Sequence, residues 1–169
     1  MTDFDLDDIA EEHLAAVKRY MTTDYPNVDA ALRRLDEAQM AQLDAFIRLV
    51  TEGLFQLPSF RGVVFRGATL SDDAAAHYVP GHVIFEHSFI SATGDIARRF
   101  PGNTTFVIAS INGRDVSMLS DTPEELEVLF FTGTRFKVLA TEHDEAANER
   151  FIYLAEIPDR RLLQGYPDL

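Results

Sequence analysis

The chain has 169 residues, of which 46% are hydrophobic and 13 are Phe, which is enough for one domain with a substantial core. It carries 28 acidic and 15 basic residues, a net charge of −13 and no basic block, which argues against binding to nucleic acid or to an anionic membrane. The sequence has no run of eighteen apolar residues, its acidic N-terminal stretch does not resemble a secretory signal, and the lack of cysteine excludes disulfides, thiolate zinc sites and a cysteine nucleophile.

The first third of the chain is predicted to be helical. Residues 5–21 have an acidic start followed by apolar residues at roughly helical spacing. Pro26 is expected to end this helix, and Asn27 is expected to cap a second one. Asp36 and Gln39 have the spacing of a capping box at the start of a third helix. We expect the apolar faces of these helices to be core, and we assign no chemistry to them.

From residue 60 onward the pattern changes to short strands. They are expected at residues 63–66, 82–93 (one or two strands), 104–111, 128–131, 135–139 and 150–157. A short helix after Ser71 and a helical turn at residues 95–100 interrupt them. Strands that follow a helical block without regular alternation favour an α+β fold. We therefore predict a single domain over residues 1–169, with a helical part at 1–58 and a β-rich part at 59–169.

An acidic turn leads directly into one of the predicted strands. In an extended chain Glu125 and Glu127 point to the same side, about 6.5–7 Å apart along the strand. Two carboxylates placed in this way can divide the work of catalysis, because one can stabilise a developing cation while the other accepts a proton. Read without its context, the same pair is typical of a solvated acidic turn.

Two other polar features lie on predicted strands. Arg66 ends an apolar strand and precedes Gly67, which lets a ligand approach the backbone. The guanidinium group offers a fork of donors that suits a phosphate. Ser91 and Thr93 alternate on one face of another strand. Each feature taken singly is also typical of an ordinary solvated strand end.

The motifs that are missing narrow the chemistry further. The sequence contains neither the glycine fingerprint of dinucleotide-binding Rossmann folds nor a P-loop, and it has no H-E-x-x-H zinc motif. His82 and His87 are five residues apart on a strand-like segment, so they are expected to face opposite sides of it. We therefore do not expect a metal site.

Three stretches taken in order resemble a known family. VVFRG (63–67), SFISAT (88–93) and EELEVLFFTGTRFKVL (124–139) are similar to the arginine–serine–glutamate class of mono-ADP-ribosyltransferases, which includes bacterial toxins and vertebrate cell-surface arginine transferases. GRDVSMLS (113–120) and YPNVDAALR (25–33) are weaker similarities, and the resemblance covers about residues 18 to 140. Ala92 and Thr93 stand where the family has Thr and Ser, whereas Ser91 keeps the family's leading serine.

The resemblance implies a fold and a set of residue roles. The fold is a helical block packed on two small, mostly antiparallel sheets, with NAD as co-substrate in the cleft between them. By the family's pattern, Glu127 holds the hydroxyls of the nicotinamide ribose, Ser91 orients Glu127, and Arg66, next to Gly67, binds NAD phosphate. Glu125 positions and deprotonates the acceptor arginine.

The loop after the serine strand is a further candidate for binding NAD. Arg98, Arg99 and Phe100 are expected to contact the phosphates and the nicotinamide, although a pair of arginines is more often a solvated face.

The expected function is the transfer of ADP-ribose from NAD to arginine side chains of a target protein. By resemblance, the chain is expected to be a monomeric bacterial toxin or effector domain, secreted by an unspecified route and active in the cytoplasm of a target cell. A neutralising immunity protein is a further candidate partner. Two alternatives stay open, an NAD glycohydrolase with water as acceptor and a catalytically silent acidic interaction domain. A glycosidase is disfavoured, because the two glutamates are too close in sequence to flank a sugar and the chain has no Trp.

Overall fold

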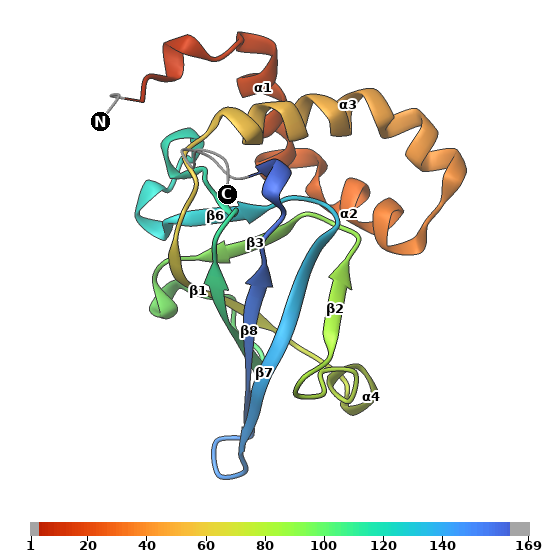
Figure 1. The fold of residues 1–169 in the computed structure, drawn as a ribbon, viewed down its shortest axis with the longest axis vertical. Helices are drawn as coiled ribbons and strands as arrows, with labels where there is room; N and C mark the ends of the chain where they lie inside the picture. The colour runs from red at the N-terminus through yellow and green to blue at the C-terminus, as the bar shows by residue number, and fades with distance from the viewer. Residues whose placement is uncertain (1–3, 163–169) are drawn as a thin grey trace.

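A computed structural model of the chain describes residues 4–162 (Figure 1). In chain order, the helical elements are η1 (Leu6–Asp8), α1 (Glu11–Arg19), the π-helical turn η2 (Tyr20–Asp24), α2 (Tyr25–Arg34), α3 (Glu37–Gln56), α4 (Asp72–Ala75), η3 (Ile96–Arg98), η4 (Ser117–Leu119), η5 (Pro123–Glu125) and η6 (Arg160–Leu162). Within this part of the chain, none of the helices has the length and hydropathy of a membrane span.

The helical block departs from the sequence prediction at Pro26. The chain does not break there, because η2 leads directly into α2, which begins at Tyr25 instead of after an Asn27 cap. Pro26 lies in the first turn of α2, directly after the π-helical turn η2, and it has no backbone N–H to donate there. The predicted cap of α3 is confirmed, since Asp36 Oδ1 accepts a hydrogen bond of 3.1 Å from the backbone N–H of Gln39.

The β-rich part forms one eight-stranded sheet in the order β2-β7-β8-β4-β1-β3-β6-β5. The strands are β1 (Gly62–Ala68), β2 (Val83–Glu86), β3 (Ile90–Thr93), β4 (Thr104–Ser110), β5 (Arg114–Asp115), β6 (Glu127–Phe130), β7 (Thr134–Asp144) and β8 (Glu149–Ile157). All neighbours are antiparallel except β4 and β8. The predicted α+β class is confirmed.

The two sheets expected from the sequence are joined. One part is β2-β7-β8-β4-β1 and the other is β3-β6-β5, and a single residue pair, Phe65 with Thr93, connects β1 to β3. The other neighbouring strands pair over two to nine residue pairs, so this junction is the thinnest part of the sheet. The sheet is therefore continuous, but it consists of two parts with one narrow connection.

Strand alternation divides the core into two clusters. Leu129 of β6 and the following Phe131 pack against the helical block together with Val17, Val50 and Leu54. The residues that alternate with them along the chain, Val128 and Phe130, belong to a second cluster with Val64, Phe106, Phe136 and Ile152. Since successive side chains of a strand point to opposite faces, Glu127 shares the helix-facing side of β6 with Leu129.

A buried arginine fixes the end of α3 relative to the sheet. The side chain of Arg114 on β5 is fully buried, and its guanidinium donates hydrogen bonds of 3.1, 2.8 and 2.8 Å to the backbone carbonyls of Leu54, Asn112 and Leu162. Its charge also lies 5.1 Å from the centre of the Phe131 ring. Arg114 therefore satisfies carbonyl groups from three separate segments and helps to hold the helical block on the sheet.

The helices α1 and α3 pack in direct contact at Gly53. A Cβ atom at this position would lie 2.6 Å from Val17 Cγ2 and 2.8 Å from the carbonyl oxygen of His13. The second atom belongs to the backbone, so it cannot move aside without shifting α1. Glycine is required here by the close approach of the two helices.

We expect Gly53→Ala to destabilise the fold by about 1–3 kcal/mol through overpacking. This cost exceeds the gain of about 1 kcal/mol that alanine brings to an exposed helix position. Urea unfolding followed by circular dichroism measures the difference, with Gln42→Ala on the exposed face of the same helix as the control. Equal or higher stability of Gly53→Ala would show that the helices do not pack as described.

Candidate functional site

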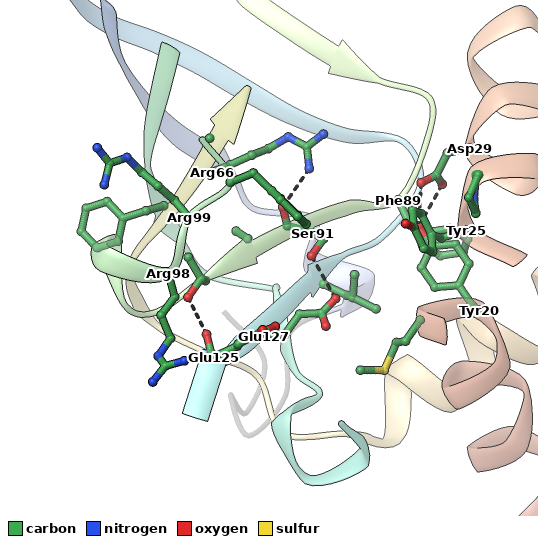
Figure 2. A pocket seen from close by; sticks show the side chains of 18 of the residues that line it. Tyr20, Tyr25, Asp29, Arg66, Phe89, Ser91, Arg98, Arg99, Glu125 and Glu127 are labelled. Carbon is green, nitrogen blue, oxygen red and sulfur yellow. Dashed lines mark hydrogen bonds between the residues drawn. The ribbon is translucent and has the colours of Figure 1, made fainter. Parts of the chain in front are cut away.

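A cavity of about 570 Å³ lies between the helical block and the strands β1, β3 and β6 (Figure 2). All eight site residues predicted from the sequence line it: Arg66, Gly67, Ser91, Arg98, Arg99, Phe100, Glu125 and Glu127. The helical wall comes from η2 and α2, with Tyr20, Met21, Tyr25, Pro26, Asp29 and Arg33. The cavity thus joins the first third of the chain to the strands that carry the motifs.

A short series of hydrogen bonds connects three neighbouring strands at the floor of this cavity. Ser91 Oγ on β3 donates to Glu127 Oε1 on β6 at 2.9 Å, and Arg66 Nη1 on β1 donates to the backbone carbonyl of Ser91 at 2.9 Å (Figure 2). The strand register pairs Thr93 with Glu127, which places Ser91 diagonally across from the glutamate. The fold therefore brings the predicted arginine, serine and glutamate together.

Burial raises the pKa of Glu127 above its ordinary value, and the nearby charge of Glu125 raises it further. The hydrogen bond from Ser91 acts in the opposite direction, because it stabilises the ionised carboxylate. Ser91 thus does two things at once: it fixes the position of one carboxylate oxygen and it offsets part of the cost of keeping a charge in a partly buried place.

Glu125 reaches the cavity in a way that the sequence did not predict. The segment from Glu125 to Glu127 is not extended: Glu125 ends η5, Leu126 has a left-handed backbone with φ 49° and ψ 51°, and Glu127 begins β6. Thr93 Oγ1 donates a short hydrogen bond to the carbonyl oxygen of Glu125. The backbone N–H of Gly94 also donates to the carbonyl of Leu126 at 3.0 Å. The end of β3 therefore holds the turn that presents the exposed Glu125.

The space next to Gly67 is filled by protein, so the expectation that a ligand approaches the backbone there is not met. A Cβ on Gly67 would lie 1.7 Å from the carbonyl oxygen of Phe100, and a Cβ on Gly102 would lie 2.3 Å from the carbonyl oxygen of Ala68. These two glycines allow the loop after η3 to lie directly on the end of β1. Gly67 therefore has a packing role in addition to lining the cavity.

The three candidate residues of that loop differ in their contacts. The guanidinium of Arg99 donates to Thr105 Oγ1 at 2.8 Å, to the carbonyl of Ile96 at 2.7 Å and to Glu149 Oε1 at 3.1 Å. Each of its three nitrogens donates to the protein, so Arg99 braces the loop. Arg98 Nε lies 3.7 Å from Asp95 Oδ2, and the side chain of Phe100 is 74% exposed. These two remain available to a ligand.

The helical wall holds functional candidates to which the sequence analysis assigned no role. The hydroxyl of Tyr20 donates to both carboxylate oxygens of Asp29, at 3.0 and 2.9 Å. Burial raises the pKa of Asp29 to about 6 and raises that of Tyr20 as well. The sequence does contain a pattern that indicates these candidates. Tyr25, Asp29 and Arg33 are spaced four residues apart, which puts a polar stripe on one face of α2.

A family model described as NAD:arginine ADP-ribosyltransferase matches residues 7–161. The chain belongs to this family. Mav of Mycobacterium avium (strain 104) is 38% identical over 151 residues, which cover 86% of this chain and 18% of Mav. Tre1 of Pseudomonas putida (strain GB-1), named an NAD(+)–protein-arginine ADP-ribosyltransferase, is 35% identical over 152 residues, which cover 89% of this chain and 30% of Tre1.

A solved structure has a similar fold. The type III effector XopAI from Xanthomonas axonopodis pv. citri superposes with a TM-score of 0.77 at 31% identity, over 90% of this chain and 70% of that one. The chain spans less than a third of the length of the curated relatives Mav and Tre1. For this member of the ADP-ribosyltransferase family, the similarity thus extends to the helical block as well as to the sheet.

We expect Arg99 and Glu149 to act as a structural pair in this ADP-ribosyltransferase-family fold. Arg99→Ala and Glu149→Ala should each lower the free energy of unfolding, and the double variant should lose less than the sum. A coupling of about 0.5–3 kcal/mol is typical of residues in contact. Urea unfolding of the four proteins measures it. Additive losses would show that this pair does not brace the loop. The guanidinium of Arg99 would then be free to bind a ligand in the cavity.

Proposed function

We propose that this chain is a catalytic domain that transfers ADP-ribose from NAD to an arginine side chain of a target protein. The observation that carries the proposal is the Ser91–Glu127 hydrogen bond inside the cavity, with Arg66 bonded to the same strand and Glu125 at the rim. Family membership supports it independently. The geometry also matches the division of labour between two carboxylates that the acidic turn indicates.

The first step is the loss of nicotinamide. The bond between the ribose carbon and the pyridinium nitrogen breaks, and its electron pair stays on nitrogen, so the leaving group is neutral and requires no general acid. A ribose cation with oxocarbenium character forms. Glu127, oriented by Ser91, holds the ribose hydroxyls and places a fixed negative charge beside this cation, which stabilises the transition state more than the ground state.

The second step is attack by the acceptor. An arginine side chain is protonated at neutral pH, since its pKa is above about 12, and it becomes nucleophilic only when it loses a proton. Glu125 is exposed at the rim, where a side chain of another protein can reach it. It accepts one proton while the guanidine nitrogen forms the new bond to the ribose carbon, and the product is an N-glycoside whose guanidinium group keeps one positive charge.

Arg66 binds the diphosphate of NAD in this proposal. Burial lowers the pKa of its guanidinium, but the group stays a cation at neutral pH. Its Nη1 holds the Ser91 carbonyl, and a guanidinium has further N–H donors for phosphate oxygens. Arg98 and Phe100 lie across the cavity on a braced loop, where they contact the phosphates and the nicotinamide.

The partners follow from this chemistry. The acceptor is a protein or a smaller molecule that presents a guanidinium, and an acidic surface favours a basic partner. XopAI, which has a similar fold, is described as a type III effector. We propose that the present chain likewise acts as a monomeric bacterial effector domain in the cytoplasm of a target cell, with a neutralising immunity protein as a further candidate partner.

Glu127→Gln is expected to remove both nicotinamide release and transfer, with a loss of at least about 10²–10³-fold, because the charge that stabilises the cation is gone. Glu125→Gln is expected to abolish transfer to protein arginine while NAD hydrolysis persists, because water does not need the same deprotonation. Release of nicotinamide and incorporation of labelled ADP-ribose into a polyarginine acceptor are measured in parallel.

Glu124→Gln is the matched control for both variants, because Glu124 is exposed on the same turn and does not line the cavity. Equal loss of hydrolysis and transfer in Glu125→Gln would refute the division of roles. A wild-type protein that consumes NAD but never labels an acceptor would instead favour the glycohydrolase alternative.

The pH dependence of NAD hydrolysis provides a separate test. The reaction needs ionised Glu127, so kcat/KM should fall as the pH drops through the raised pKa of this group. Ser91→Ala removes a hydrogen bond that favours the ionised form, and the acidic limb of the profile should move to higher pH. Asp29→Asn is the control, because Asp29 also has a raised pKa in the cavity. A limb that moves only in Asp29→Asn would contradict the assignment to Glu127.

A further inference from the structure

A second cavity, of about 260 Å³, adjoins the first one and shares Arg33 and Arg66 with it. Its floor is apolar and belongs to the core inside the sheet, and its polar lining is made by the two arginines, Tyr78 and Glu86. The apolar lining residues are Ala68, Leu70, Ile90, Phe106, Ile108, Phe136 and Leu154. Arg66 therefore lies at the boundary between the two cavities. The proposed contacts with NAD involve only the first of them.

Glu86 is a charged residue on the inward side of a strand. On the edge strand β2, Val83 and Phe85 point outward and are 52% and 51% exposed, whereas Ile84 and Glu86 point inward. A strand whose inward side serves only the core carries apolar residues there, as Ile84 does, so an inward glutamate is unexpected. The carboxylate of Glu86 makes no hydrogen bond or ion pair within 4 Å to any residue between positions 4 and 162.

The charges around Glu86 are those of a prepared binding site. Burial raises the pKa of this carboxylate, while Arg66 and Arg33 lower it from a distance too long for a direct ion pair. The neighbouring Tyr78 has a pKa raised to about 12 by burial and by the charge of Glu86, so its hydroxyl keeps its proton at neutral pH. An acceptor, a neutral hydroxyl and two cations thus face a cavity with an apolar floor.

The order of groups in NAD matches the order of groups in the two cavities. The diphosphate is the middle of the molecule, with the nicotinamide ribose on one side and adenosine on the other. If the nicotinamide ribose lies at Glu127 and the diphosphate at Arg66, the molecule continues past Arg66 into the second cavity. An aromatic base on an apolar floor, with its ribose hydroxyls toward an unpaired carboxylate, satisfies the groups that line this cavity.

We propose that Glu86 makes this site select NAD over NADP, by accepting hydrogen bonds from the hydroxyls of the adenosine ribose and repelling a 2′-phosphate. The proposal rests on the function proposed above. A carboxylate recognises the unmodified ribose in other dinucleotide sites for the same physical reason, since it accepts from both hydroxyls and cannot accommodate a second anion. Here the acid comes from the inward face of an edge strand.

Arg33 gives the proposal a second consequence. It lies in the last turn of α2 and lines both cavities, so the site already contains a cation that suits a 2′-phosphate once the opposing carboxylate is removed. Glu86 therefore sets the preference by charge, and not by lack of space.

The test measures kcat/KM for nicotinamide release from NAD and from NADP. In Glu86→Gln we expect the ratio of the two values to shift toward NADP by about tenfold or more, the size expected for a lost hydrogen bond to a charged group. Adding Arg33→Gln to this variant should reverse the gain with NADP. Glu145→Gln, an exposed acid in the β7–β8 turn, should keep the wild-type ratio.

An unchanged ratio in a folded Glu86→Gln would overturn the proposal. If that variant does not fold, calorimetry on the wild type decides, because ADP-ribose must then bind more tightly than its 2′-phosphate derivative, and equal affinities would also overturn it. A wild type that cleaves neither dinucleotide would instead count against the proposed function, so the two failures are distinguishable.

Discussion

The hydrogen bond from Ser91 to Glu127 is the interaction on which the rest of the site depends. It holds a partly buried carboxylate in one position and favours its charged form, although burial and Glu125 both raise the pKa of Glu127. The strand alternation that turns Ser91 and Glu127 toward the helices creates the cavity wall, and Arg66 fixes the serine strand from the other side. A carboxylate held in advance costs no reorganisation when the cation forms.

The acids that line the cavity lower the free energy of unfolding as the pH rises. Asp29 has a pKa of about 6 in the folded protein and an ordinary value of 3.8, so between these values the folded state binds more protons than the unfolded state. Its contribution to stability is present at low pH and is lost as the pH rises through about 6. Glu127 acts in the same direction. Acids are kept in the cavity against their effect on folding, which is typical of groups retained for function.

The sequence predicted the parts of the site that lie within single strands or turns. Arg66, Ser91 and Glu127 were identifiable because each sits in a short motif whose order along the chain resembles one family. Tyr20 and Asp29 were missed, because their hydrogen bond depends on the π-helical turn that aligns η2 with α2. The packing contacts of Gly67 and Arg99 were not predicted for a related reason: their partners, Phe100 and Glu149, become neighbours only when the loop folds onto β1 and the β7–β8 hairpin. Local pattern indicates which residues are unusual, whereas tertiary contacts decide which of them are free.

The narrow connection between the two parts of the sheet has a mechanical consequence. Arg66 belongs to one part, Ser91 and Glu127 belong to the other, and a single backbone pair joins β1 to β3 beside them. The separation between the Arg66 guanidinium and the Glu127 carboxylate is thus set at one pivot, reinforced by the hydrogen bond from Arg66 to the Ser91 carbonyl. A slight rotation about that pivot would change the width of the cavity between Arg66 and Glu127 while each half of the sheet keeps its own packing.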